Sequence, residues 1–143
     1  MIETGEVRRL LKHALERARH AAEAHRVESD LAREWFEQFL TEQAAPVFRQ
    51  VASALRPEGY AFQVFTPAGS VRLSSDRSAD DFIELALDTA RSPVALVGRT
   101  SRTRGRRVIE TERIVREGAA VRATTEHDVL GFLLEEVGSV VER

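Results

Sequence analysis

The chain contains no cysteine, and its 143 residues include only one Met, one Trp, one Tyr and four Pro. The lack of thiols excludes disulfides, cysteine nucleophiles and cysteine metal ligands. No stretch approaches the roughly 20 apolar residues that a membrane-spanning helix requires. The first residues mix apolar and charged positions where a secretory signal needs a continuous apolar block. We therefore expect a cytoplasmic protein with no membrane partner.

The familiar catalytic signatures are also missing. The chain has no Gly-rich phosphate loop, no His-Glu-x-x-His and no Gly-x-Ser-x-Gly. Its formal net charge of −2 gives no general attraction for nucleic acid. Lys12 is the only lysine among 21 basic residues, a bacterial-like bias that we attribute to codon usage. We expect no cofactor and no catalytic residues, and favour a protein that is not an enzyme.

The first 56 residues carry apolar side chains at helical spacing. Thr4 can cap a first helix over about residues 5–27, and Ser29 can cap a second that runs to about Leu55. Pro46 should kink the second helix near Glu42. The pattern predicts a helical hairpin over residues 4–56. The first helix presents an alanine-rich stripe of Val7, Leu11, Ala14, Ala18 and Ala21.

Beyond Gly59 the apolar residues come in short runs separated by turn residues, which is typical of strands. Pro67-Ala68-Gly69 and Arg104-Gly105 are the expected hairpin turns. A final helix over residues 125–142 should begin at Thr124 or Thr125. The expected strands cover 60–66, 70–75, 81–88, 92–101 and 106–115, with a further short strand at 119–123. The whole chain, 1–143, is predicted to be one α+β domain, in which helices cover one face of an antiparallel β-meander at 60–123.

An arginine-rich stretch, GRTSRTRGRR, occupies residues 98–107 and has no apolar or acidic side chain. If Arg104-Gly105 forms a two-residue turn, Arg99 lies opposite Glu110; a longer loop changes this register. We expect a mobile hairpin unless an anionic group holds it. It could dock on an acidic protein surface, contact nucleic acid, which we regard as the weaker hypothesis, or be a solvated turn. The candidate protein- or anion-binding residues are Arg99, Arg102, Arg104, Arg106 and Arg107.

Aromatic residues suggest a second kind of site, a small-ligand or enzymatic cavity between sheet and helices. At this spacing such residues more often belong to the core, and that interpretation stays open beside the cavity. The residues concerned are Trp35, Tyr60, Phe62, Phe65 and Phe82.

Two clusters of ionisable residues resemble metal or catalytic sites only weakly. His13, Glu16, His20 and Glu23 share one face of the first helix, but local pairing on a polar face explains them better than a metal does. We therefore expect no metal. Asp80, Asp81, Glu84 and Asp88 form an acidic group that we interpret as a solvated strand edge.

The leading hypothesis is a non-catalytic binding or adaptor protein that acts as a homodimer. Helices of the predicted length would cross the whole domain, and such helices often serve as association surfaces. An acidic protein is the second partner we consider. The alternatives are the ligand cavity and nucleic-acid contact through residues 98–107.

Overall fold

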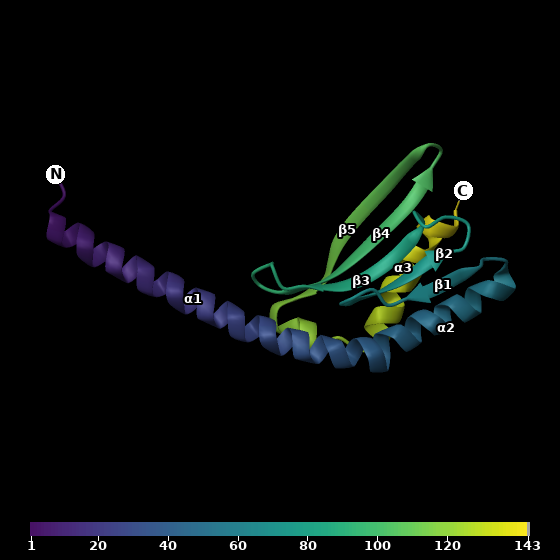
Figure 1. Ribbon diagram of the computed structural model, residues 1–143, viewed down its shortest axis with the longest axis horizontal. Coiled ribbons are helices and arrows are strands. Elements are labelled where there is room, and N and C mark those ends of the chain that lie inside the picture. Colours follow the sequence, from purple (N-terminus) through teal and green to yellow (C-terminus); the bar gives the residue numbers. More distant parts are fainter. Residues whose placement is uncertain (143) are drawn as a thin grey trace.

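The computed structural model describes residues 1–142 as an α+β protein in which one long helix projects from a sheet domain (Figure 1). The helical segments are α1 (Thr4–Phe39), the π-helical turn η1 (Leu40–Ala44), α2 (Ala45–Leu55), the 3-10 turns η2 (Arg56–Glu58) and η3 (Gly118–Ala123), and α3 (Glu126–Val141). The strands are β1 (Phe62–Phe65), β2 (Ser70–Ser75), β3 (Phe82–Asp88), β4 (Ala95–Arg104) and β5 (Arg107–Glu117). Within residues 1–142, no helix combines the length and apolar character that crossing a bilayer requires.

The predicted helical hairpin over residues 4–56 is wrong, because α1 is one uninterrupted helix of 36 residues. Ser29 does not begin a second helix. It lies in the middle of α1, with 5% of its surface exposed. Neither glycine nor proline occurs between residues 24 and 34, so nothing in the backbone ends the helix there. A serine at a buried contact is compatible with a helix interior when the surrounding residues are helix formers.

The predicted kink before Pro46 is confirmed as the turn η1, which covers Glu42. Proline cannot donate the hydrogen bond that a continuous α-helix needs at its position. The widened π turn accommodates this loss, and Pro46 falls in the first turn of α2. The bend redirects the chain so that α2 runs beneath β1 and β2 (Figure 1).

The five strands form an antiparallel meander in the order β1-β2-β3-β4-β5, as the alternating pattern predicts. Gly69, with a φ of 77°, closes the β1–β2 turn at the predicted place. The β4–β5 turn lies one residue later than predicted. Arg104 pairs with Arg107, so Gly105 and Arg106 form the turn. Arg99 consequently faces Glu112, and the pairing with Glu110 that a turn at Arg104-Gly105 would give is not formed.

The segment after β5 forms the 3-10 turn η3, so the short strand expected at 119–123 is not formed. Gly118, with a φ of 62°, turns the chain out of β5 and directs it across the sheet towards α1. The start of the last helix is confirmed. Thr125 accepts a hydrogen bond from the Asp128 backbone N–H, and the Asp128 carboxylate accepts one in return, which forms a capping box.

The hydrophobic core lies between one face of the sheet and the helices. Helix α2 packs on β1 and β2, α3 packs on β3 and β4, and the last part of α1 reaches β3. Fully buried side chains come from all these layers: Phe48, Leu73, Ile83, Leu85, Leu96 and Leu133. This core anchors only the C-terminal third of α1. The remainder of that helix extends beyond the domain.

Candidate functional site

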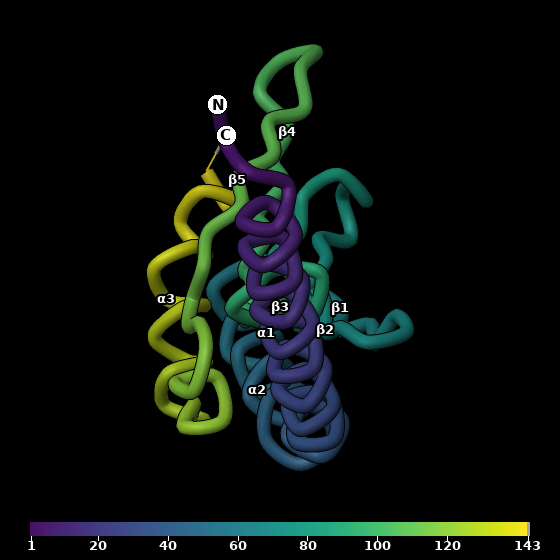
Figure 2. The backbone as a smooth tube through the Cα atoms, turned by 90° about the vertical axis from the view of Figure 1, so that its left-hand side faces the viewer, coloured from purple at the N-terminus to yellow at the C-terminus, as the bar shows by residue number. Residues whose placement is uncertain are grey.

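Residues 4–24 of α1, here called the arm, extend away from the domain (Figure 1) and are exposed along their whole length. Figure 2 views the molecule from the end of the arm. At 1.5 Å per residue the arm is about 32 Å long. The helix first contacts the domain at His25, whose Nε2 lies 3.0 Å from the carbonyl oxygen of Thr89. Arg33 donates a hydrogen bond of 3.0 Å to the hydroxyl of Thr89. The arm is therefore attached to the domain only at its C-terminal end.

The arm carries an apolar stripe that no other part of residues 1–142 covers. Its larger members are Val7, Leu10, Leu11 and Leu15, with 47%, 53%, 56% and 46% of their surfaces exposed. The stripe continues, at spacings of three and four residues, into the buried positions Ser29, Ala32, Phe36 and Phe39. One face of one helix therefore packs on the sheet at its C-terminal end and faces solvent along the arm.

The charges of α1 are divided unequally along its length. Residues 4–20 carry five basic side chains and two acidic ones, a net charge of +3. Residues 21–39 carry five acidic side chains and two basic ones, a net charge of −3. The helix is therefore a long dipole of side-chain charge.

A groove opens where the arm meets the domain, between α1 and η3. Its volume is about 220 Å³. Val27 and Leu31 contribute its exposed apolar surface from α1. The lining is completed by Ala24, Glu28, Ala32, Val94, Gly118, Ala119 and Arg122. The groove is mainly apolar and has one acid and one base on its walls.

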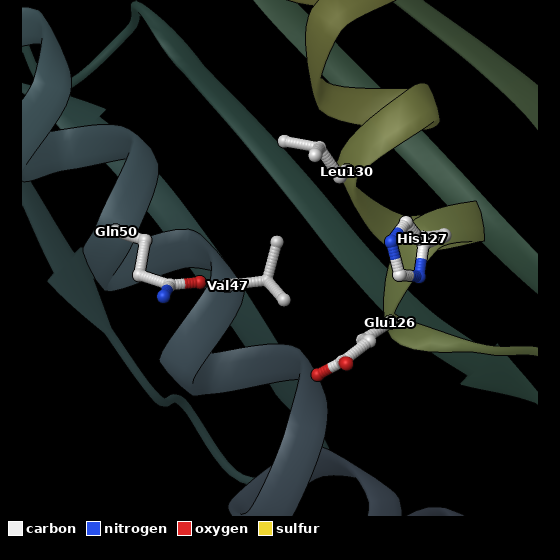
Figure 3. Close-up of a pocket in the computed structure, with 5 residues that line it drawn as sticks. All are labelled: Val47, Gln50, Glu126, His127 and Leu130. Carbon is white, nitrogen blue, oxygen red and sulfur yellow. The ribbon is translucent and has the colours of Figure 1, made fainter.

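A second groove separates α2 from α3 on the outside of the domain (Figure 3). Near the start of α3, Val47 and Gln50 face Glu126, His127 and Leu130 across a cavity of about 180 Å³ (Figure 3). The groove continues along the two helices as a cavity of about 340 Å³. This part is almost wholly apolar and is lined by Gln50, Val51, Ala54, Leu55, Leu130, Leu134 and Val137.

The arginine-rich hairpin contacts α3 along much of its length. We expected it to be mobile unless an anionic group held it, and the structure contains such a group. Arg104 donates hydrogen bonds of 2.9 Å to the carbonyl oxygen of Ser139 and 3.3 Å to that of Glu142. These carbonyls carry the partial negative charge of a helix C-terminus. Thr100 donates to the carboxylate of Glu136 over 3.1 Å. The anionic group that holds the hairpin therefore belongs to the same chain.

The five candidate arginines occupy three different surroundings. Arg99 lies on the sheet face opposite the helices and forms an ion pair with Glu84, 3.2 Å apart. Arg102 is half-buried, and Arg104 is held by α3. Only Arg106 and Arg107 are exposed at the tip. The structure does not bring the five guanidinium groups together into one site.

Glu84 is the centre of a charged row across the face of the sheet that faces away from the helices. Its carboxylate lies 2.8 Å from Arg72 and 3.2 Å from Arg99, and 9% of its side chain is exposed. Arg72 also lies over the Phe82 ring, 3.9 Å from the centroid. The interpretation of the acidic group as a solvated edge is therefore wrong for Glu84, and for Asp81, which is also buried. Residues distant in sequence supply the partners, and sequence spacing does not reveal them.

The five aromatic residues considered as a cavity lining lie apart. Trp35 stacks on the core residue Phe39, with ring centroids 4.5 Å apart, and is itself partly buried against the core. Phe62 belongs to the core between sheet and helices, whereas Phe82 lies under Arg72 on the other face of the sheet. Tyr60 and Phe65 are largely exposed.

The four weak metal candidates, His13, Glu16, His20 and Glu23, all lie on the exposed arm. Helical geometry places them on the side opposite Val7, Ala14 and Ala18. Within residues 1–142 no group of three or more His, Cys, Asp or Glu side chains is arranged to hold a metal ion.

The groove beside η3 was not predicted from the sequence. We expected residues 119–123 to form a strand, whereas the turn at Gly118 directs this segment towards α1. The isolation of the arm was not predicted either. One feature of the sequence could have revealed this isolation: the apolar stripe of α1 contains alanine and leucine but no aromatic residue before Trp35. No family model, curated protein or solved structure compared with this chain matches it.

Proposed function

We propose that the protein is a non-catalytic adaptor that acts as a homodimer, joined through antiparallel contact between the arms of two copies. The observation that carries this proposal is the continuity of one helix face. The positions that pack on the sheet at the end of α1 are followed outward by an exposed stripe of the same spacing. The apolar stripe of the arm is exposed in the single chain, and exposed apolar surfaces of this kind often mark interaction sites.

The sizes of the side chains favour a second copy, in antiparallel orientation, as the cover. The larger residues, Val7, Leu10, Leu11 and Leu15, lie between residues 7 and 15 of the arm. The alanines are concentrated from residue 14 onward: Ala14, Ala18, Ala21, Ala22 and Ala24. Antiparallel pairing sets large residues of one helix against small residues of the other, so the two axes keep an even separation. Parallel pairing would bring leucines together at one end and alanines at the other.

The division of charge along α1 favours the same orientation. In an antiparallel pair, the +3 segment at residues 4–20 of one copy extends towards the −3 segment at 21–39 of the other. In a parallel pair, like charges would lie side by side along the whole helix. Electrostatic complementarity of this kind fixes orientation more than it adds affinity.

Such a dimer would hold two sheet domains at opposite ends of a helical connector, an arrangement suited to bridging two partners. Each domain would present the exposed tip residues Arg106 and Arg107 for an acidic protein surface. The contacts that hold Arg99 and Arg104 support a structural role for those two side chains.

Sedimentation equilibrium of the wild type and two arm variants tests the homodimer. Leu11→Glu places a charge in the apolar stripe and should weaken association at least about tenfold. His13→Glu is the matched control, since it adds the same side chain two residues away on the polar face, and it should leave association unchanged. Circular dichroism checks that both variants fold. A wild type that stays monomeric at high micromolar concentration refutes the proposal.

A small apolar ligand bound between α2 and α3 is the second candidate function. The cavity of about 340 Å³ there favours it, because ligand pockets are mostly apolar and begin near this size. A thermal-shift screen tests it: a hit should raise the melting temperature of the wild type but not of Leu134→Glu. A full shift in that variant places the ligand elsewhere.

A further inference from the structure

We infer that the groove between α1 and η3 receives the N-terminal turns of α1 from a second copy. This inference rests on the antiparallel homodimer proposed above and assigns it a register. In that register, residues near Val7 of one chain lie against residues near Glu28 of the other, and the twofold axis passes close to Ala18.

The first step is the position of the groove. A partner helix lying antiparallel on the arm progresses from residue 4 towards residue 24 and then meets the domain. The groove lies at this meeting point, where His25 contacts Thr89 and η3 lies against α1 (Figure 1). The partner's N-terminal turns arrive at the same place, because antiparallel order pairs the start of one arm with the end of the other.

The second step is the continuity of apolar surface from the arm into the groove. Leu10, Ala14, Ala21, Ala24 and Leu31 are separated by four, seven, three and seven residues. This heptad-like spacing places them along a line that winds slowly around the helix, within a stripe about 100° wide. Ala24 and Leu31 line the groove. A helix packed on the arm along this line therefore passes directly into the groove without leaving the apolar surface.

The third step is the match between the groove and its occupant. The first residues present Ile2, 68% exposed, and Val7 as apolar contacts, with two acids and two bases around them: Glu3, Glu6, Arg8 and Arg9. The groove offers Val27, Leu31, Val94 and Ala119 as apolar walls, with Glu28 as an acid and Arg122 as a base. Glu23 and Asp30 lie on the same stretch of α1 and are paired with Arg26 and Arg33, so these four side chains add no net charge. The groove and its proposed occupant therefore match through apolar surface, and each also carries charges of both signs.

Cysteine cross-linking tests the register, because the wild type has no cysteine of its own. Val7→Cys and Glu28→Cys are made as two separate proteins, mixed, and oxidised. Residues 7 and 28 of one straight helix are about 31 Å apart, so any disulfide must join two copies. The mixture should give the cross-linked dimer, and neither protein alone should. Cross-linking of Val7→Cys alone would indicate parallel arms and overturn the inference.

A pair of charge substitutions separates this inference from the homodimer itself. Leu31→Glu places a charge in the groove and should weaken dimerisation about tenfold or more. Val108→Glu is the control, an exposed apolar residue near the tip of the β4–β5 hairpin and away from the arm, and should leave the dissociation constant unchanged. Equal dissociation constants for the two variants, in a protein that still dimerises, refute the groove and leave the arm contact standing. A wild type that is monomeric refutes both.

Discussion

The Phe132 ring of α3 lies directly over Gly98 of β4, so that a β-carbon at residue 98 would overlap two ring carbons. The guanidinium of Arg113 lies over the same ring, 5.0 Å from its centroid. Gly98 is therefore required by a close approach between helix and strand. Phe132 is itself 2% exposed and cannot move aside without disturbing the core.

Gly98→Ala should destabilise the protein by about 1–3 kcal/mol, the usual cost of overpacking a core. Gly131 provides the contrast, because a β-carbon there meets no atom within 4 Å and its helical position favours alanine. Gly131→Ala should stabilise the protein by up to about 1 kcal/mol. Urea unfolding of both variants measures the difference. A Phe132→Leu change should recover part of the loss in Gly98→Ala, and failure to do so would place the strain elsewhere.

The capping box of α3 should give a measurable dependence of stability on pH. Backbone hydrogen bonding at Thr125 is the main cause that lowers the pKa of Asp128, with Arg116 also contributing, although partial burial opposes them. Because the folded pKa is depressed, the stabilisation is present above the unfolded pKa of about 3.9 and is lost as the pH falls through the folded value. The stability difference between wild type and Asp128→Asn should therefore shrink as the pH is lowered from about 5 to 2. A constant difference in acid would contradict this role.

Removal of the other half of the capping box has a simpler expectation. Thr125→Ala should cost about 1 kcal/mol at neutral pH, because the N–H of Asp128 loses its acceptor. Thermal unfolding measures the loss, and Thr125→Ser should retain most of the stability because it keeps the hydroxyl.

Glu84 should contribute to stability through its two arginine partners. Glu84→Gln keeps the shape but removes the charge between Arg72 and Arg99, and we expect a loss of about 2 kcal/mol. Glu110→Gln on β5 is the control, since that side chain is exposed and should change stability by less than about 0.5 kcal/mol. Denaturant titration of both variants gives the comparison. Equal effects would show that the charged row is only a surface feature.

Arg104 should hold the hairpin against the end of α3. Arg104→Ala removes the donors to the carbonyls of Ser139 and Glu142, and we expect faster amide exchange in the last turn of α3 and in residues 100–109. The loss in stability should be about 1 kcal/mol, typical of a cation at a helix C-terminus. Arg106→Ala, at the exposed tip, should leave the exchange rates unchanged.

The helicity of the arm should depend on protein concentration. A helix without tertiary contacts is only marginally stable at this length, and contact with a second copy would stabilise it. Dilution over a range in which wild type dissociates should therefore reduce the circular dichroism signal at 222 nm in the wild type, but not in Leu11→Glu, which is already dissociated at those concentrations because its association is weaker. Identical dilution curves for the two proteins would contradict the coupling.

The sequence was informative where one local rule decided the structure. Gly69 closes the first hairpin and Thr125 caps the last helix, because each residue satisfies its requirement within a few positions. The predicted helix start at Ser29 was wrong. Serine is a good N-cap residue, but Ser29 lies buried in the middle of α1. Contact with the sheet and the lack of any helix breaker outweigh the capping preference there.

The candidate site was only partly predictable. The stripe of Val7, Leu11 and Ala18 follows directly from the period of the helix, and so does the expectation of association through it. The groove depends on Gly118, which sends η3 back towards α1, and a contact of this kind is long-range in sequence. The hairpin arginines do not share one face of the sheet, because alternate residues of a strand point to opposite faces. Arg99 and Arg104 are five residues apart on β4, so their side chains lie on opposite faces.

The rigidity of α1 gives the proposed assembly a built-in unit of length. Because helical rise is fixed, removing seven residues from the arm would bring each domain about 10 Å nearer to the middle of the connector while preserving the contact face. Removing five would rotate the domain by more than a quarter turn about the helix axis. The number of residues in the arm would therefore set both the separation of the two sheet domains and their relative rotation about the helix axis.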